Sequence, residues 1–218
     1  MHIEKRSIKY FFSTEGETEK WYLERLEKLI NESKDSICKV CFHVRKDSPH
    51  SFVKKISILQ KTEVYHFFDV ESVESEYEKR FIGVLDNMKK AEKLGKTLSY
   101  IPVYTNLSFE LWMILHKMDC NGCISDRKKY LTHINKIFNT DYESLREYKE
   151  ESHFKQILNK ISIEDVKDAV FRADKIMREN IRRGYTLNKH NNFFWYKENP
   201  STEVGNIIAK ILKACGLV

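Results

Sequence analysis

Apolar residues in the first half of the chain occur in short runs that alternate with stretches of helical spacing. Runs rich in β-branched and aromatic residues predict strands, and amphipathic stretches with a period near 3.6 predict helices. The predicted strands are residues 7–14, 37–44, 63–69 and 97–105. The predicted helices between them are residues 17–31, 49–60 and 74–94. This alternation predicts an α/β fold with a mostly parallel four-stranded sheet and flanking helices.

Beyond the fourth strand the hydrophobic pattern becomes helical. The predicted helices there are residues 108–116, 127–138, 152–160, 163–183 and 201–214. Residues 185–199 are aromatic and polar and are interpreted as a connection. We therefore expect an α/β core over 1–106 and a helical C-terminal part over 107–218, packed on or beside the core. No Gly/Ser-rich or Pro-rich linker separates the two.

Several polar side chains stand where helices are predicted to begin. Such residues accept hydrogen bonds from the free N–H groups of the first turn. The expected caps are Ser48 before Pro49, Thr14 in a capping box with Glu17, Asn106 or Ser108, and Asn199 before Pro200.

The composition is that of a folded chain. Of 218 residues, 41% are hydrophobic and 32% charged, which does not fit a disordered protein. The apolar runs are far shorter than a membrane span, and the first residues do not resemble a signal peptide. We expect a cytoplasmic protein that does not contact a membrane. The net charge of +6 is compatible with a polyanionic partner.

Five cysteines include two C-x-x-C pairs, Cys38/Cys41 and Cys120/Cys123, so a zinc site is an alternative to weigh. The first pair lies in a predicted strand, where positions i and i+3 point to opposite faces. We therefore expect reduced thiols and no bound zinc.

Carboxylates follow two of the predicted strands. Glu15 follows the first, and Asp69 and Glu71 end the third, with both of these on one face if the strand continues. Ligand sites in open α/β sheets lie beyond the carboxyl ends of strands, and hard oxygen ligands suit Mg²⁺ or Mn²⁺. The alternative for Glu15–Glu19 is helix capping, and for Asp69 and Glu71 it is turn chemistry.

Four segments together resemble a known family. They are EGETEKWYLERL, FFDVES, TNLSFELWMILH and NPSTEVGNIIAKIL, spread over most of the chain. In this order they are similar to the motifs of the RloB-like proteins, which belong with the Toprim-type folds. Two positions depart from the family pattern: Glu71 is the second acid of a DxD-type motif, and Leu107 replaces a proline.

The resemblance implies a Toprim-like sheet and Mg²⁺- or Mn²⁺-dependent cleavage of phosphodiester bonds. It implies that Glu15 acts as general acid or base or as a further metal ligand, and that Asp69 and Glu71 are metal ligands. It also implies a role in anti-phage defence by abortive infection, an ATPase partner encoded nearby, and DNA or RNA, tRNA included, as substrate. The alternatives are a non-catalytic module that docks an ATPase, and a zinc-stabilised nucleic-acid binder.

Three further residues are accessory candidates. Glu19 lies in the first turn after Glu15, where capping explains it in part. Glu110 lies in the first turn of the 108–116 helix and is either a helix-dipole partner or an additional group near the metal. For His116, at the end of that helix, we favour a buried or capping role over a metal-binding one.

A basic and aromatic segment near the C-terminus is a candidate nucleic-acid contact. Cations bind phosphates and aromatic rings stack on unpaired bases. The alternative is a solvated helix end followed by aromatic core residues. The candidate contacts are Arg178, Arg182, Arg183, Lys189 and Trp195.

Overall fold

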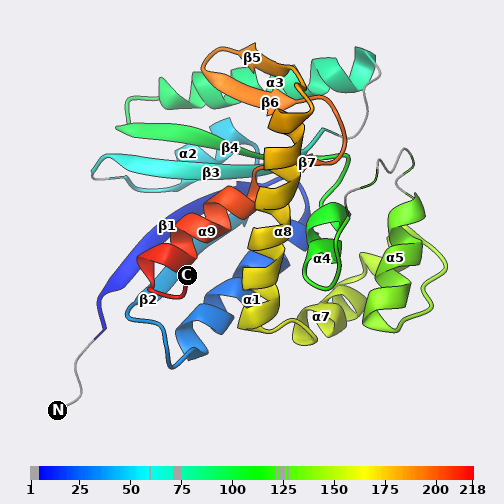
Figure 1. Ribbon diagram of the computed structural model, residues 1–218. Coiled ribbons are helices and arrows are strands. Elements are labelled where there is room, and N and C mark those ends of the chain that lie inside the picture. Colours follow the sequence, from blue (N-terminus) through cyan, green and yellow to red (C-terminus); the bar gives the residue numbers. More distant parts are fainter. Residues whose placement is uncertain (1–4, 59, 71–74, 121, 123–125, 127) are drawn as a thin grey trace.

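A computed structural model describes residues 5–58, 60–70, 75–120, 122, 126 and 128–218. Four parallel strands form most of one sheet (Figure 1). They are β1 (Ser7–Thr14), β2 (Lys39–Lys46), β3 (Thr62–Asp69) and β4 (Leu98–Asn106). The predicted strands are confirmed to within two residues at each end. The strand order β2-β1-β3-β4 places β1 and β3 at the centre, so their carboxyl ends are neighbours.

A fifth strand completes the sheet, and the hydrophobic pattern did not predict it. β7 (Ser201–Thr202) pairs antiparallel with the end of β4, Thr105 opposite Thr202 and Asn106 opposite Ser201. The expected cap at Asn199 is wrong, because α9 (Val204–Ala214) begins only after this strand. A two-stranded hairpin, β5 (Leu187–His190) and β6 (Phe193–Tyr196), lies within the segment interpreted as a connection.

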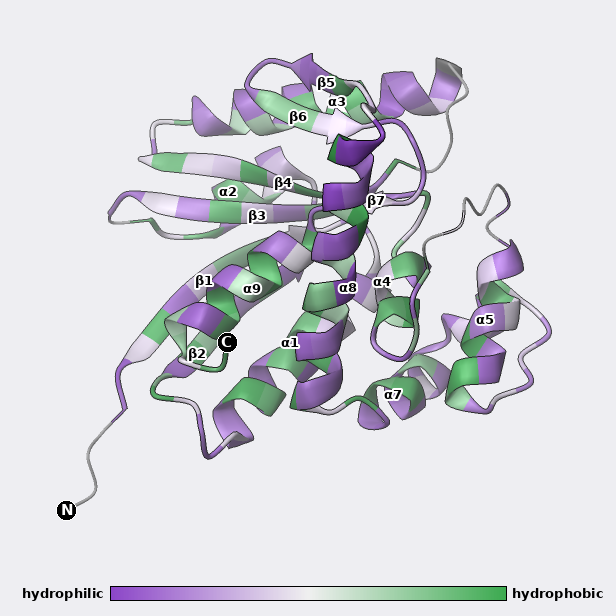
Figure 2. Ribbon diagram, viewed as in Figure 1, coloured by the Kyte–Doolittle hydropathy of each residue, from purple (hydrophilic) through white to green (hydrophobic). Residues whose placement is uncertain are grey.

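Helices cover the two faces of the sheet unequally. The helices that follow the first three strands are α1 (Glu17–Glu32), α2 (Pro49–Lys55) and α3 (Ser75–Glu92). The remaining helices are α4 (Glu110–Leu115), α5 (Lys128–Phe138), α6 (Leu145–Tyr148), α7 (Glu151–Asn159) and α8 (Ile163–Arg182). Figure 2 shows hydrophobic and hydrophilic residues alternating along these helices, as expected of amphipathic helices around a core.

The larger hydrophobic core joins both halves of the chain. It runs from Tyr10 in β1 to Leu217 after α9 and takes in side chains of α1, α4, α5, α7 and α8. A smaller core on the opposite face packs α2, α3 and β6 against β3 and β4. The helical C-terminal part therefore shares its main core with the sheet. None of the helices in the described ranges is both long and apolar enough to cross a membrane.

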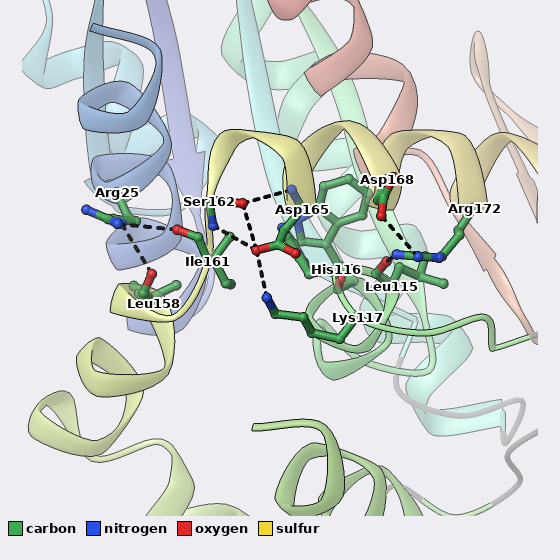
Figure 3. A network of polar contacts seen from close by, with 11 residues as sticks. Arg25, Leu115, His116, Lys117, Leu158, Ile161, Ser162, Asp165, Asp168 and Arg172 are labelled. Atoms are coloured by element: carbon green, nitrogen blue, oxygen red, sulfur yellow. Dashed lines mark hydrogen bonds and ion pairs between the residues drawn. The ribbon is translucent and has the colours of Figure 1, made fainter. Parts of the chain in front are cut away.

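Polar contacts at the start of α8 tie three helices together (Figure 3). Ser162 and Asp165 form a capping box, and Lys117, just beyond α4, contacts Asp165 at 2.7 Å. From α1, Arg25 donates hydrogen bonds to the carbonyls of Leu158 and Ile161 at 3.2 and 3.3 Å. These contacts fix α4 against α8 and hold the loop before α8 against α1.

Candidate functional site

The carboxyl ends of two adjacent strands, β1 and β3, carry the predicted acids. Glu15 directly follows β1 and is exposed, and its N–H donates to the carbonyl of Phe67 in β3 at 3.1 Å. Asp69 is the last residue of β3, is half-buried, and lies opposite Thr105 of β4. Parallel pairing thus brings Glu15 and Asp69 to the same edge of the sheet, whereas Glu71 lies outside the described residues.

The turn between β1 and α1 does not contain the expected capping box. The helix begins after Gly16, which has an extended conformation and no side chain to cap it. Thr14 does not cap the helix, since its hydroxyl donates to the carbonyl of Gly16 at 2.9 Å. Glu17 lies on the surface near Lys20 and Lys46. The capping-box prediction is therefore wrong.

Gly16 makes room for Glu19. A Cβ at position 16 would stand 2.2 Å from Oε2 of Glu19, a distance that no real contact tolerates. The Glu19 carboxyl is folded back over the turn, is 5% exposed, and accepts a hydrogen bond from Thr18 at 2.9 Å. Burial raises the pKa of Glu19, and the nearby Glu110 raises it further. The glycine thus leaves the space that the inward-pointing carboxyl of Glu19, the third glutamate of this stretch, occupies.

Glu110 forms a buried ion pair that the sequence pattern did not reveal. Its side chain is 1% exposed, and its Oε1 lies 2.8 Å from Nζ of Lys149, the residue after α6. Burial opposes the charge on Lys149, but the fields of Glu110, Asp69 and Glu19 outweigh it and raise the pKa of Lys149. Asp69, Glu19, Glu110 and Lys149 therefore form one electrostatic group, which we call the carboxylate cluster.

Several buried side-chain oxygens have no hydrogen-bond partner in the described part of the chain. They include Oδ1 of Asn106, Oγ of Ser108 and the hydroxyl of Tyr148. The expectation that Asn106 or Ser108 caps α4 is wrong, because the N-cap is Phe109 and has no side-chain cap. Instead, the amide nitrogen of Asn106 donates to the carbonyl of Lys197 at 2.6 Å and so joins β4 to the segment before β7. The peptide bond between Asn106 and Leu107 is cis.

His116 is a buried residue of the core and contacts other core residues. It is 1% exposed, and its Nδ1 and Nε2 contact the carbonyl of Trp112 at 2.9 Å and the hydroxyl of Tyr22 at 3.2 Å. Burial lowers the pKa of His116 to about 4. Both nitrogens are thus engaged by neighbouring core residues, as the favoured structural interpretation anticipated.

A cleft of about 630 Å³ adjoins the edge at Glu15. Cationic side chains of Lys46 and Arg80 line it, and His66 of β3 forms part of its wall. The Nδ1 atom of His66 lies 2.7 Å from Oγ of Ser13, and burial lowers the pKa of His66 to about 3, so the imidazole is neutral. His66 lies in the middle of an apolar strand, and nothing in its spacing distinguished it from a core residue.

The basic and aromatic C-terminal segment is divided between the surface and the core. Three arginines at the end of α8 are paired with acids of the same helix: Arg178 with Asp174, and Arg182 and Arg183 with Glu179. Trp195 is 5% exposed and packs on Phe81 with ring centroids 5.1 Å apart. Lys189 is exposed and lies over the ring of Phe194 at 5.4 Å. A base therefore cannot stack on Trp195 in this arrangement.

The cysteines that the structure describes lie in separate surroundings. Cys38 is buried with its Sγ 2.7 Å from that of Cys215, whereas Cys41 lies near the exposed His43. Cys120 is buried, and Cys123 lies outside the described residues. The absence of zinc remains a prediction.

The donor chemistry of the edge suits a hard cation better than zinc. In the described ranges no three His, Cys, Asp or Glu side chains are grouped so that they could hold a metal. Mg²⁺ needs only one or two protein carboxylates, with waters and substrate phosphates supplying the rest. Asp69 at the strand end meets that requirement, and the carboxylate cluster already holds one cationic group, Lys149.

Comparison with known proteins gave a family but no individual relative. The family model described as RloB-like protein matches residues 10–211. Neither the curated proteins nor the solved structures compared with the chain gave a match. The matched range covers most of the chain and includes Glu15, Asp69 and Glu110. The chain belongs to the RloB-like protein family.

Proposed function

We propose that this protein is a Mg²⁺-dependent nuclease that hydrolyses phosphodiester bonds at the carboxyl edge of the sheet. The observation that carries the proposal is the arrangement of Glu15 and Asp69 on adjacent strand ends, with Asp69 belonging to the carboxylate cluster and Glu15 lining the cleft. Family resemblance supports it, because Toprim-type domains use a glutamate after the first strand and acids after a later one. The Toprim-type relationship is part of the proposal.

Each acid at the edge has a distinct proposed role. Asp69 and Glu71 would hold the cation, with Mn²⁺ as a substitute for Mg²⁺. When bound, the metal would supply Lewis-acid stabilisation of the charge that develops on the phosphoryl group. Glu15 is exposed at the cleft and would accept the proton of the attacking water.

Lys149 has the chemistry to act on the same phosphoryl group. Its ammonium is held by Glu110 at 2.8 Å and is one-third exposed. An ammonium beside the cation site can donate to a phosphoryl oxygen, and it offsets the repulsion between carboxylates while no substrate is bound. Glu19 and Glu110 would then orient Lys149 and bring negative charge close to the cation.

The biological setting follows from the family and is also proposed. The protein would act in the cytoplasm as the effector of an anti-phage defence system, in which cleavage of DNA or RNA, tRNA included, leads to abortive infection. An ATPase encoded nearby would be its partner.

The test is incubation of the purified protein with mixed DNA and RNA, with Mg²⁺, Mn²⁺ or EDTA, and with or without the neighbouring ATPase. The proposal expects cleavage that requires the metal and disappears in Asp69→Ala. Absence of cleavage under every condition, together with binding of the ATPase, would instead support a non-catalytic docking module. Stoichiometric zinc that is lost in Cys120→Ser would support the zinc-stabilised binder.

A further inference from the structure

One half of a sheet face is left uncovered by helices. On β1 and β2, alternate side chains point into the main core beneath α1 and α9. The other set points to the opposite face, where α2 and α3 pack mainly over β3 and β4, and Phe11 of β1 packs against this smaller core with part of its side chain. The side chains of that set are exposed or half-buried: Lys9, Phe11, Cys41, His43 and Arg45.

Two stacked rings on this face form what we call the Phe11/His43 platform, and its outer ring is His43 of the edge strand β2. Phe11 of β1 and His43 of β2 are direct neighbours in the register, with ring centroids 4.9 Å apart and planes inclined by 13°. They line a groove of about 560 Å³ between the sheet and the end of α2. His43 is exposed and Phe11 half-buried, so the pair presents aromatic surface that the described chain leaves accessible.

Cations surround the platform. Lys9, Arg45 and Lys55 line the same groove. Asp47 is the acid that faces them: it accepts from Nε of Arg45 at 2.9 Å and is also paired with Lys55. About half of the Arg45 and Lys55 side chains remains exposed, 50% and 45%, so Asp47 orients these cations without covering them. Three cations against one acid leave the groove positive.

The groove leads toward the proposed active edge. Because β1 and β2 are parallel, Arg45 and Lys46 lie beside Ser13 and Thr14, one step before Glu15. Asp47 and Ser48 then line the cleft that contains Glu15 and Arg80. From Phe11 to Glu15 the strand spans roughly 13 Å, the rise of about four stacked nucleotides.

We propose that this face binds single-stranded nucleic acid. An unpaired base stacks on the exposed ring of His43, which Phe11 supports from the other side, and flanking phosphates contact Lys9, Arg45 and Lys55. Aromatic stacking combined with a cationic groove is the combination that recognises single strands of any sequence, since every base has a π-face. Delivery of the strand to Glu15 rests on the proposed nuclease function, but binding does not.

The test measures binding without catalysis. Fluorescence anisotropy with a labelled single-stranded RNA, a single-stranded DNA of the same sequence and the matching duplex is recorded in EDTA. We expect both single strands to bind, and His43→Ala to weaken this binding about tenfold. Arg45→Ala should reduce the salt dependence by about one phosphate contact. His43→Phe should retain the affinity.

Two controls and four outcomes decide the inference. Phe171→Ala removes a 70% exposed aromatic side chain on α8, and Lys213→Ala an exposed cation on α9; neither should change binding. Wild-type affinity in both His43→Ala and Arg45→Ala would overturn the inference. Preference for the duplex, or binding of anionic vesicles that these variants abolish, would overturn it as well. Single-strand binding by an Asp69→Ala variant would support this inference even if no cleavage were found.

Discussion

At the scale of residues, the carboxylate cluster depends on single side chains that hold its charges in place. Lys149 is the cation, Glu110 its direct partner, and Gly16 the residue that lets Glu19 turn inward. Each has a buried or crowded environment that a substitution would change measurably. Three of the predictions below concern single residues with such environments.

Replacing Lys149 by Met should destabilise the protein by about 3 kcal/mol, because it leaves a buried carboxylate without its partner. Glu110→Gln in the same chain should recover part of the loss. Chemical denaturation of the single and double variants measures both effects. Lys117→Met is the matched control, since it breaks a 2.7 Å ion pair with Asp165 away from the cluster and should cost about 1 kcal/mol. Equal effects of the two lysine substitutions would contradict the role assigned to Lys149.

Gly16→Ala should displace the Glu19 carboxyl and lower stability by about 1–3 kcal/mol, because the new methyl group takes its place. The cost should largely vanish when Glu19 is also alanine. Gly83→Ala serves as control: nothing lies within 4 Å of the added Cβ in α3, so this change should stabilise by about 0.5–1 kcal/mol. Thermal melts of the wild type and of these three variants measure the effects. A Gly16→Ala chain as stable as the wild type would argue against the close contact.

His66 should make stability depend on pH below neutrality. Burial lowers the pKa of His66 in the folded protein to about 3 from its usual value of 6.5, so the unfolded chain takes up a proton first as the pH falls. The contribution is complete above pH 6.5 and is lost as the pH falls toward 3, by at most about 1.4 kcal/mol per pH unit. His66→Asn should therefore flatten the profile of unfolding free energy over this range. An unchanged slope would show that His66 is already protonated or exposed in the native state.

At the scale of elements, the sheet is completed beside the site by the pairing of β4 with β7, two strands that lie far apart in the sequence. β7 exists because Ser201 and Thr202 pair with the end of β4, and Asn106 holds the preceding loop through its amide nitrogen. The segment around β7 therefore positions α9 and the start of α4 with respect to the strand ends.

Asn106→Ala should loosen this junction at a cost of about 2–3 kcal/mol, since backbone carbonyls before β7 lose their buried donor. Hydrogen exchange should accelerate in residues 196–204 while β1 and β3 stay protected. Asn188→Ala, which removes a local bond in the exposed hairpin, should leave this pattern as in the wild type. Uniform acceleration throughout the sheet would mean global destabilisation rather than loss of a local tie.

The elements that the sequence predicted well are those with strong local patterns. The four parallel strands follow from runs of β-branched and aromatic residues, and Ser48 caps α2 as expected. β7 was missed because its strand conformation comes from pairing with β4, while Asn199-Pro200 looks like a helix start. The β5–β6 hairpin turns at Asn191, which has a positive φ of 56°, a conformation that asparagine tolerates, and this turn signal was overlooked.

At the scale of the whole molecule, topology explains why part of the site was predictable. The rule that sites lie beyond the carboxyl ends of parallel strands pointed to Glu15 and Asp69 from the pattern alone. Lys149 could not be found in this way, because only the tertiary structure brings the residue after α6 to Glu110 of α4. The Phe11/His43 platform could not be predicted either, because it also depends on tertiary packing. It exists because α2 and α3 leave half of one face of the sheet open.

The most direct test of the central claim is nucleic-acid cleavage and thermal stability measured on the same preparations of wild type, Asp69→Ala and Asp168→Ala. Asp168 is a surface acid of α8 and serves as control. We predict that Asp69→Ala loses Mg²⁺-dependent cleavage and the Mg²⁺-induced rise in melting temperature, while its metal-free melting temperature is unchanged or higher, because one repelling carboxylate is gone. Glu15→Ala should lose turnover and keep part of the metal affinity. Retained cleavage with a lowered melting temperature in Asp69→Ala would contradict the account and leave Asp69 as a structural residue.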